Sequence, residues 1–144
     1  MDKNLEEILV DVLNGVYSRI IFNEERLIKD MLGDSLSLKE FLTLDVIYSL
    51  KSSGNNTAGN VAKVLGITIS TCTINVDRLI AKGYVNKVRD VGDKRVAYLE
   101  LTDKGKQIKN KREQMHRHKI ISAIDKLTMS EKVSLMNAMN KLDI

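Results

Sequence analysis

The sequence contains no proline, one cysteine and few aromatic residues. Because proline is absent and only 8 of the 144 residues are glycine, helices can run long without a break. The single cysteine excludes an intramolecular disulfide. With aromatic residues at 4%, a core must be filled by Leu, Ile, Val and Met. The length suits one domain with a real hydrophobic core.

No apolar run approaches the roughly 20 residues that a membrane helix needs. The N-terminal sequence MDKNLEEILVDVL carries acidic residues early and lacks the layout of a signal peptide. We therefore expect a cytoplasmic protein with no membrane partner. There is also no nucleophile elbow, phosphate-binding loop or paired-carboxylate motif, so we predict neither an enzyme nor a cofactor.

Charge is distributed unevenly along the chain. Residues 1–56 carry a net charge of −4, residues 57–112 carry +7, and residues 113–144 carry +1. A basic centre suggests a polyanion as partner, and nucleic acid is the usual one. Uneven charge on an ordinary solvated surface is the equally simple alternative.

Hydrophobic periodicity predicts helices over most of the chain. The first helix is expected to end near Met31, where GDSLS breaks it, and its apolar residues recur at three- and four-residue spacing. Ser37 and Glu40 form a capping box for a second helix. Thr57 and Thr68 can cap a third and a fourth helix. The apolar positions of the first helix are Leu5, Ile8, Leu9, Val12, Val16 and Ile20.

A β-hairpin follows the fourth helix. YVNKV and RVAYLEL read as strands around the turn RDVGD, and a lone hairpin is marginal in water unless it packs on helices. Thr102 then begins a long helix, and Thr128 with Glu131 caps the last one. We predict a mainly α protein with a small β-hairpin, a winged helix-turn-helix flanked by dimerisation helices. The expected parts of this single domain are 37–101 for the winged helix-turn-helix, 102–127 for a long linking helix, and 1–31 and 113–144 for dimerisation.

The third and fourth helices have the layout of a helix-turn-helix. Ala62 lies four residues before Gly66, so two helices can approach closely and then turn sharply. On the fourth helix an inward face is expected from Ile69, Cys72, Val76, Leu79 and Ile80. The outward polar residues are candidates for contacts with base edges or phosphates; they are Ser70, Thr71, Thr73, Asn75 and Arg78. Ile74 either touches a thymine methyl group or turns back into the core.

The turn of the hairpin carries the remaining candidates for DNA contact. Gly92 is expected to permit the tight reversal. Asp93 can pair with Arg95, or with another cation such as Arg89. This pairing would limit the rotamers of the arginine. Arg95 would then enter a narrow minor groove, while Lys94 and Arg89 hold phosphates. The alternative is an exposed ion pair of little consequence for folding.

The sequences GITISTCTINVDRLIAKGYV and RDVGDKRVAYLELTDKG resemble the MarR family of transcriptional regulators. The resemblance rests on the cation-rich wing with Asp93 and Arg95, and on Leu101-Thr102 followed by Gly105. Within that family, LKEFLTLDVIYSL and the recognition segment are most similar to the repressors of fatty-acid biosynthesis. The resemblance implies a homodimer on a pseudo-palindromic, double-stranded DNA operator, with long-chain acyl carrier protein as corepressor. The basic segment from Lys104 to Arg112 is then the expected dock for that acidic carrier.

Dimerisation also has a physical basis, since the first and last helices are rich in apolar residues and lie outside the winged segment. Pairing two copies would bury these faces and place two recognition helices on successive major grooves. A monomeric bundle is the alternative. Two other functions remain open: a repressor released by a small amphipathic ligand, and a protein-interaction dimer without operator binding.

His116 and His118 are two residues apart and do not share a helix face. No metal site is therefore predicted, although distant segments could complete one. Cys72 is expected to be a small core residue. Redox sensing is a minor option, because the start of a helix can lower the pKa of a thiol.

Overall fold

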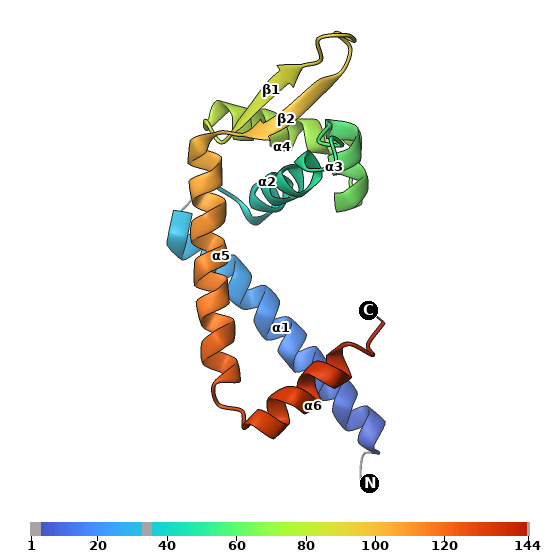
Figure 1. Ribbon diagram of the computed structural model, residues 1–144, viewed down its shortest axis with the longest axis vertical. Coiled ribbons are helices and arrows are strands. Elements are labelled where there is room, and N and C mark those ends of the chain that lie inside the picture. The colour runs from blue at the N-terminus through green and yellow to red at the C-terminus, as the bar shows by residue number, and fades with distance from the viewer. Residues whose placement is uncertain (1–3, 33–35, 144) are drawn as a thin grey trace. The chain divides into compact units, whose positions relative to one another are not determined.

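The computed structural model describes residues 4–32 and 36–143. Figure 1 shows the order of its elements. These are α1 (Leu5–Leu32), α2 (Leu38–Lys51), α3 (Ala58–Leu65), α4 (Ile69–Ala81), β1 (Val85–Arg89), β2 (Ala97–Leu101), α5 (Asp103–Ile124) and α6 (Met129–Met139). The chain divides into two compact units, 1–109 and 110–144. The mainly helical winged-helix fold with a two-stranded hairpin is confirmed.

Side-chain caps set the starts of the helices, as the sequence predicts. The Ser37 hydroxyl accepts from the Glu40 amide, and the Glu40 carboxylate accepts from the Ser37 amide. The same reciprocal box joins Thr128 and Glu131 at the start of α6. Such caps satisfy amides that a helix leaves unbonded. The predicted break GDSLS spans residues 33–37, of which 33–35 lie outside the described residues.

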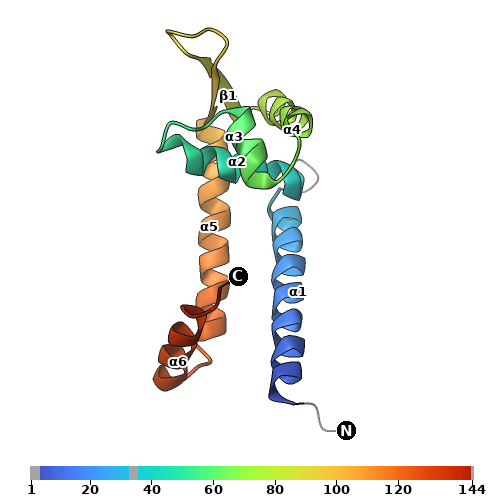
Figure 2. The same ribbon diagram turned by 90° about the vertical axis from the view of Figure 1, so that its right-hand side faces the viewer.

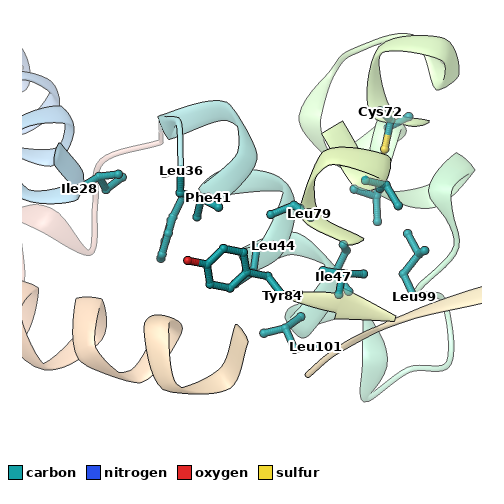
Figure 3. Close-up of a cluster of buried hydrophobic side chains, with 14 residues drawn as sticks. Ile28, Leu36, Phe41, Leu44, Ile47, Cys72, Leu79, Tyr84, Leu99 and Leu101 are labelled. Atoms are coloured by element: carbon teal, nitrogen blue, oxygen red, sulfur yellow. The ribbon is translucent and has the colours of Figure 1, made fainter. Parts of the chain in front are cut away.

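The core of the first unit lies among α2, α3, α4 and the hairpin. Figure 3 shows side chains from these elements gathered in one cluster. Phe41, Leu44, Ile47 and Leu79 are fully buried, and Leu99 reaches the cluster from β2. This packing supplies the support that a lone hairpin lacks in water.

The strands β1 and β2 pair antiparallel, with Val85 opposite Leu101 and Arg89 opposite Ala97. The hairpin extends beyond α2, α3 and α4, so its tip projects away from the core (Figures 1 and 2). Buried Leu99 and Leu101 alternate with less buried residues of β2. The alternation that predicts the return strand therefore corresponds to buried side chains, which anchor the base of the hairpin.

Near its C-terminal end, helix α1 contacts the core cluster of its unit through Ile28 and Met31, and Leu27 is buried beside them. Its predicted apolar face is exposed along most of the helix; examples are Leu5, Leu9 and Ile20 at 71%, 50% and 52%. In the second unit, α6 exposes a comparable set, namely Met129, Val133, Met136 and Met139.

No single helix within 4–32 and 36–143 is long and apolar enough to cross a membrane. The bent pair of α3 and α4 satisfies the criteria by length and composition alone.

Candidate nucleic-acid interface

Helices α3 and α4 form a helix-turn-helix with a bend of 112° between them. Gly66 makes the turn in the left-handed region with φ of 64°, and its amide donates to the carbonyls of Ala62 and Lys63. Ala62 is buried, as its small side chain at the contact requires. Thr68 then caps α4 by accepting from the Thr71 amide at 3.1 Å. The predicted motif is present in full.

The inward face of α4 is made by Cys72, Val76 and Leu79, each with no exposed surface. Two predictions about this helix are wrong. Ile69, expected inside, is 61% exposed, because it occupies the first turn beyond the edge of the core. Asn75, expected to face outward, is only 7% exposed, because it lies about 40° from Leu79 and about 60° from Cys72 around the helix, beside these buried side chains.

The other four candidates on α4 remain accessible. Ser70, Thr71 and Arg78 are exposed, and Thr73 is half-buried. The Thr73 hydroxyl donates to the Ile69 carbonyl at 2.9 Å, and the Thr71 hydroxyl lies 2.9 Å from that of Thr68. Hydroxyl groups can both donate and accept, so these bonds leave acceptor capacity for a ligand.

The tip of the hairpin holds an arginine in one orientation. Arg95 Nε donates to Asp93 Oδ1 at 3.1 Å, and one Nη donates to Oδ2 at 3.2 Å. The Arg95 amide also donates to Oδ1. These hydrogen bonds hold the pKa of the Asp93 carboxyl below its usual range. Of the two pairings expected for Asp93, the one with Arg95 is present, and it presents a guanidinium whose side chain is 90% exposed.

Asp90, rather than Gly92, organises the turn before this pair. Asp90 Oδ2 accepts from the amides of Gly92 and Asp93 at 3.1 and 2.8 Å. Gly92 has no positive φ, and an added Cβ would meet Asp90 only at 3.4 Å, an ordinary contact. The expected need for glycine there is therefore wrong. Arg89 donates to the Lys94 carbonyl at 2.9 Å and closes the base of the loop.

A buried asparagine that the sequence analysis missed holds the outer edge of β2. The Leu99 amide donates to the Asn56 carbonyl at 2.7 Å, and Asn56 Nδ2 donates back to the Leu99 carbonyl at 2.7 Å. The backbone and the side chain of Asn56 thus both hydrogen-bond to the outer edge of β2 and join the start of α3 to the hairpin. Its only sequence signal was an asparagine directly before the Thr57 cap.

Two exposed ion pairs tie the hairpin to the helices beneath it. Lys87 on β1 lies 3.5 Å from Asp77 on α4, and Lys51 on α2 lies 3.2 Å from Glu100 on β2. Each contributes little to folding. The first also neutralises an acidic side chain on the helix expected to face DNA.

A mostly buried ion pair joins the start of α2 to the end of α4. Lys82 Nζ lies 2.8 Å from Glu40 Oε2, and the Glu40 side chain is 4% exposed. Burial by itself would raise the pKa of Glu40. The hydrogen bonds from Lys82 and from the Ser37 amide outweigh it, so the pKa lies below the ordinary value of 4.5. The end of the recognition helix is therefore held in place by a charge.

We expect Glu40→Gln to flatten the dependence of stability on acidic pH. A lowered folded-state pKa gives stability that is present above the unfolded pKa and lost as pH falls through the folded pKa. At pH 7 the loss should be about 1–2 kcal/mol, less than for a fully buried pair because the Lys82 side chain is 36% exposed.

Urea unfolding between about pH 3.5 and 7 measures this effect. Glu100→Gln is the matched control, since it removes an exposed carboxylate paired with Lys51. The prediction is wrong if Glu40→Gln keeps the wild-type slope below pH 4.5.

The basic start of α5 is partly engaged already. Lys104 Nζ donates to the Lys82 carbonyl at 2.9 Å and lies 4.4 Å from the Tyr84 ring centre. Lys109 lies 4.3 Å from the Tyr48 ring centre and 3.8 Å from Asp45. Both lysines hold α5 to the winged helix, which limits their use as a dock for another protein.

Cys72 is buried, and burial raises the pKa of its thiol. The predicted placement of Cys72 in the core is confirmed. The raised pKa gives no support to the minor option of redox sensing. Among the residues that the structure describes, no group of three His, Cys, Asp or Glu side chains could hold a metal ion.

Comparison with known proteins places this geometry among regulators. A family model described as Transcriptional regulator SarA/Rot matches residues 26–112. The uncharacterized HTH-type transcriptional regulator YkoM of Bacillus subtilis (strain 168) is 27% identical over 120 residues, covering 83% of this chain and 76% of that protein.

Solved structures share the fold over nearly the whole chain. Streptococcus pneumoniae FabT in complex with DNA is 25% identical with a TM-score of 0.80, covering 94% of this chain and 92% of that one. A MarR family protein from Bacillus stearothermophilus, at 23% identity, has a TM-score of 0.73 and covers 97% and 95%.

Proposed function

Because the chain belongs to the SarA/Rot family of transcriptional regulators, we propose that it works as a homodimeric repressor that binds a pseudo-palindromic operator. The chain is a DNA-binding regulator of the winged-helix type, not an enzyme. The observation that carries the proposal is the exposed guanidinium of Arg95, held by Asp93 at the tip of the wing. The cytoplasm is the expected location.

The proposed mode of binding uses both parts of the winged helix. Helix α4 enters the major groove, with Ser70, Thr71, Thr73 and Arg78 toward bases and phosphates. Arg95 enters the adjacent minor groove, and Lys94 and Arg89 contact phosphates. Asn75 is not an outward contact in this arrangement, because it is buried.

A homodimer is proposed because each unit exposes an apolar helix. The apolar face of α1 and the methionine-rich face of α6 both lie open in the single chain. Burying such faces between two copies removes apolar area from water. It also gives the operator its two half-sites.

The proposed effector is long-chain acyl carrier protein acting as corepressor. The similarity to fatty-acid-biosynthesis repressors supports it, together with the 25% identity to FabT. The dock for the acidic carrier would use basic side chains of α5 other than Lys104 and Lys109.

We expect selection from a random DNA pool to yield a palindromic site with half-sites about one helical turn apart. Binding should weaken steeply with salt, as counterion release requires. A chain that selects no sequence in low salt is instead a protein-interaction dimer.

A titration with acylated carrier protein then tests the effector. Tighter operator binding supports the corepressor. An unchanged affinity would refute the similarity in function to the fatty-acid-biosynthesis repressors and leave the DNA-binding function in place. Release of the operator by a small amphipathic ligand would instead identify a ligand-released repressor.

A further inference from the structure

Ile74 lies at the centre of the exposed stripe of α4. At about 100° per residue, Ser70 and Arg78 each lie about 40° from Ile74 around the helix. Thr71 and Asp77 lie about 60° from it on either side. All four polar neighbours are exposed, and Ile74 itself is 53% exposed.

The buried face of the same helix lies opposite. Cys72, Val76 and Leu79 are about 140–160° from Ile74 and have no exposed surface. Ile74 therefore cannot turn back into the core, which was one of its two expected placements. Single exposed apolar residues are common and need no explanation. Ile74 does need an explanation, because it lies midway between polar side chains on the face of α4 opposite the core.

The charges around Ile74 suit a polyanion. The one acidic neighbour, Asp77, is paired with Lys87 of the wing at 3.5 Å. Arg78 adds an exposed cation on the same stripe. The major groove of DNA displays one apolar group that such a side chain can contact, the C5 methyl group of thymine.

We propose that Ile74 determines operator sequence by contacting a thymine methyl group. This inference rests on the proposed DNA-binding function and adds a specificity residue to it. The polar residues around Ile74 position the helix through hydrogen bonds. Ile74 distinguishes thymine from bases that lack the methyl group, and in a homodimer it does so once in each half-site.

The test uses the duplex selected from a random pool by the full-length wild-type protein. Each thymine is replaced in turn by deoxyuridine, which removes only the methyl group. For wild type we expect one position per half-site where the replacement weakens binding about fourfold, and about 15-fold when both half-sites carry it. In Ile74→Ala the same replacement should have no effect.

Two further variants keep the test specific. Ile69→Ala removes the same side chain from the same helix, about 140° away, and should retain the full effect of deoxyuridine. Ile74→Val keeps a branched apolar group and should retain part of it. Unfolding midpoints close to wild type show that each variant is folded, as expected for exposed positions.

The outcomes separate this inference from the function beneath it. If wild type selects an operator but Ile74→Ala suffers the same deoxyuridine effect, or wild type shows none, Ile74 does not read thymine and the inference is wrong. If no operator is selected, the proposed function fails and the inference falls with it. If the exposed face of α4 binds a protein instead of DNA, no operator will be selected.

Discussion

Arg95→Ala is expected to weaken operator binding sharply and to reduce the preference for the operator over random DNA, while leaving the fold nearly intact. The Arg95 side chain is 90% exposed, so its pair with Asp93 adds little to folding. In the groove the same side chain should be worth about 1–3 kcal/mol per wing, and a homodimer loses two. The salt slope should fall by about one unit for each wing. Fluorescence anisotropy over a range of salt measures both.

Lys94→Ala is the matched control for Arg95→Ala. It removes one cation from the neighbouring position, so it should lower the salt slope by a similar amount. As a phosphate contact, it should weaken operator and random DNA about equally. Only Arg95→Ala should reduce the ratio of the two affinities. Equal ratios for the two variants would mean that Arg95 acts merely as a charge.

Asp93→Ala separates orientation from charge. It removes a negative charge beside DNA, so charge counting predicts tighter binding. We expect weaker binding, because the carboxylate holds Arg95 through two side-chain hydrogen bonds and one from its amide. Holding the guanidinium beforehand reduces the conformational entropy lost on binding. Tighter binding by this variant would refute the wing hypothesis.

Gly105→Ala is expected to destabilise the protein by about 2–4 kcal/mol. A Cβ at this position would lie 2.3 Å from the Tyr84 carbonyl oxygen and 3.3 Å from Leu101 Cγ. That same carbonyl accepts from the Thr102 amide at 3.0 Å, and the Thr102 hydroxyl donates to the Gly83 carbonyl at 2.7 Å. The methyl group therefore forces the first turn of α5 away from the chain that enters β1.

The size of the effect follows from three contributions. Overpacking costs about 1–3 kcal/mol or more, and each strained hydrogen bond about 1 kcal/mol. The higher helix propensity of alanine stabilises the folded state by about 1 kcal/mol and so offsets part of this loss. The clash outweighs the gain because both clashing groups are held by backbone.

Gly59→Ala in α3 provides the control, since nothing lies within 4 Å of its added Cβ and its φ is not positive. This variant should be neutral or more stable by about 0.5–1 kcal/mol. Urea unfolding of the full chain gives both values. Similar shifts for the two variants would show that Gly105 is not a close-contact position.

Much of the fold could be predicted because its signals are local. Caps at Ser37, Thr57, Thr68 and Thr128 act within three residues of their partners, and Gly66 takes the left-handed turn expected of it. The pair at the wing tip was also local, since Asp93 and Arg95 are two residues apart.

The error at Asn75 was local, because this residue lies about 40° from Leu79 and about 60° from Cys72, within the inward face that the helical spacing predicts. The contacts that the sequence did not reveal depend on distant parts of the chain. Asn56 looked like part of a loop, although its partner Leu99 lies 43 residues later. Glu40 was recognised as a cap but not as the partner of Lys82, 42 residues away. Periodicity within one segment carries no information about such contacts.

The buried thiol of Cys72 gives the chain a built-in reporter of local opening. It is the only cysteine in the sequence, it lies in the core cluster of the winged helix (Figure 3), and a thiol reagent cannot reach it while that core is closed. The rate of modification therefore reports how often α4 separates locally from α2 and α3. Operator binding should slow that rate in proportion to occupancy, without any label being introduced. The protein thus offers a kinetic measure of how far DNA stiffens the domain that holds it.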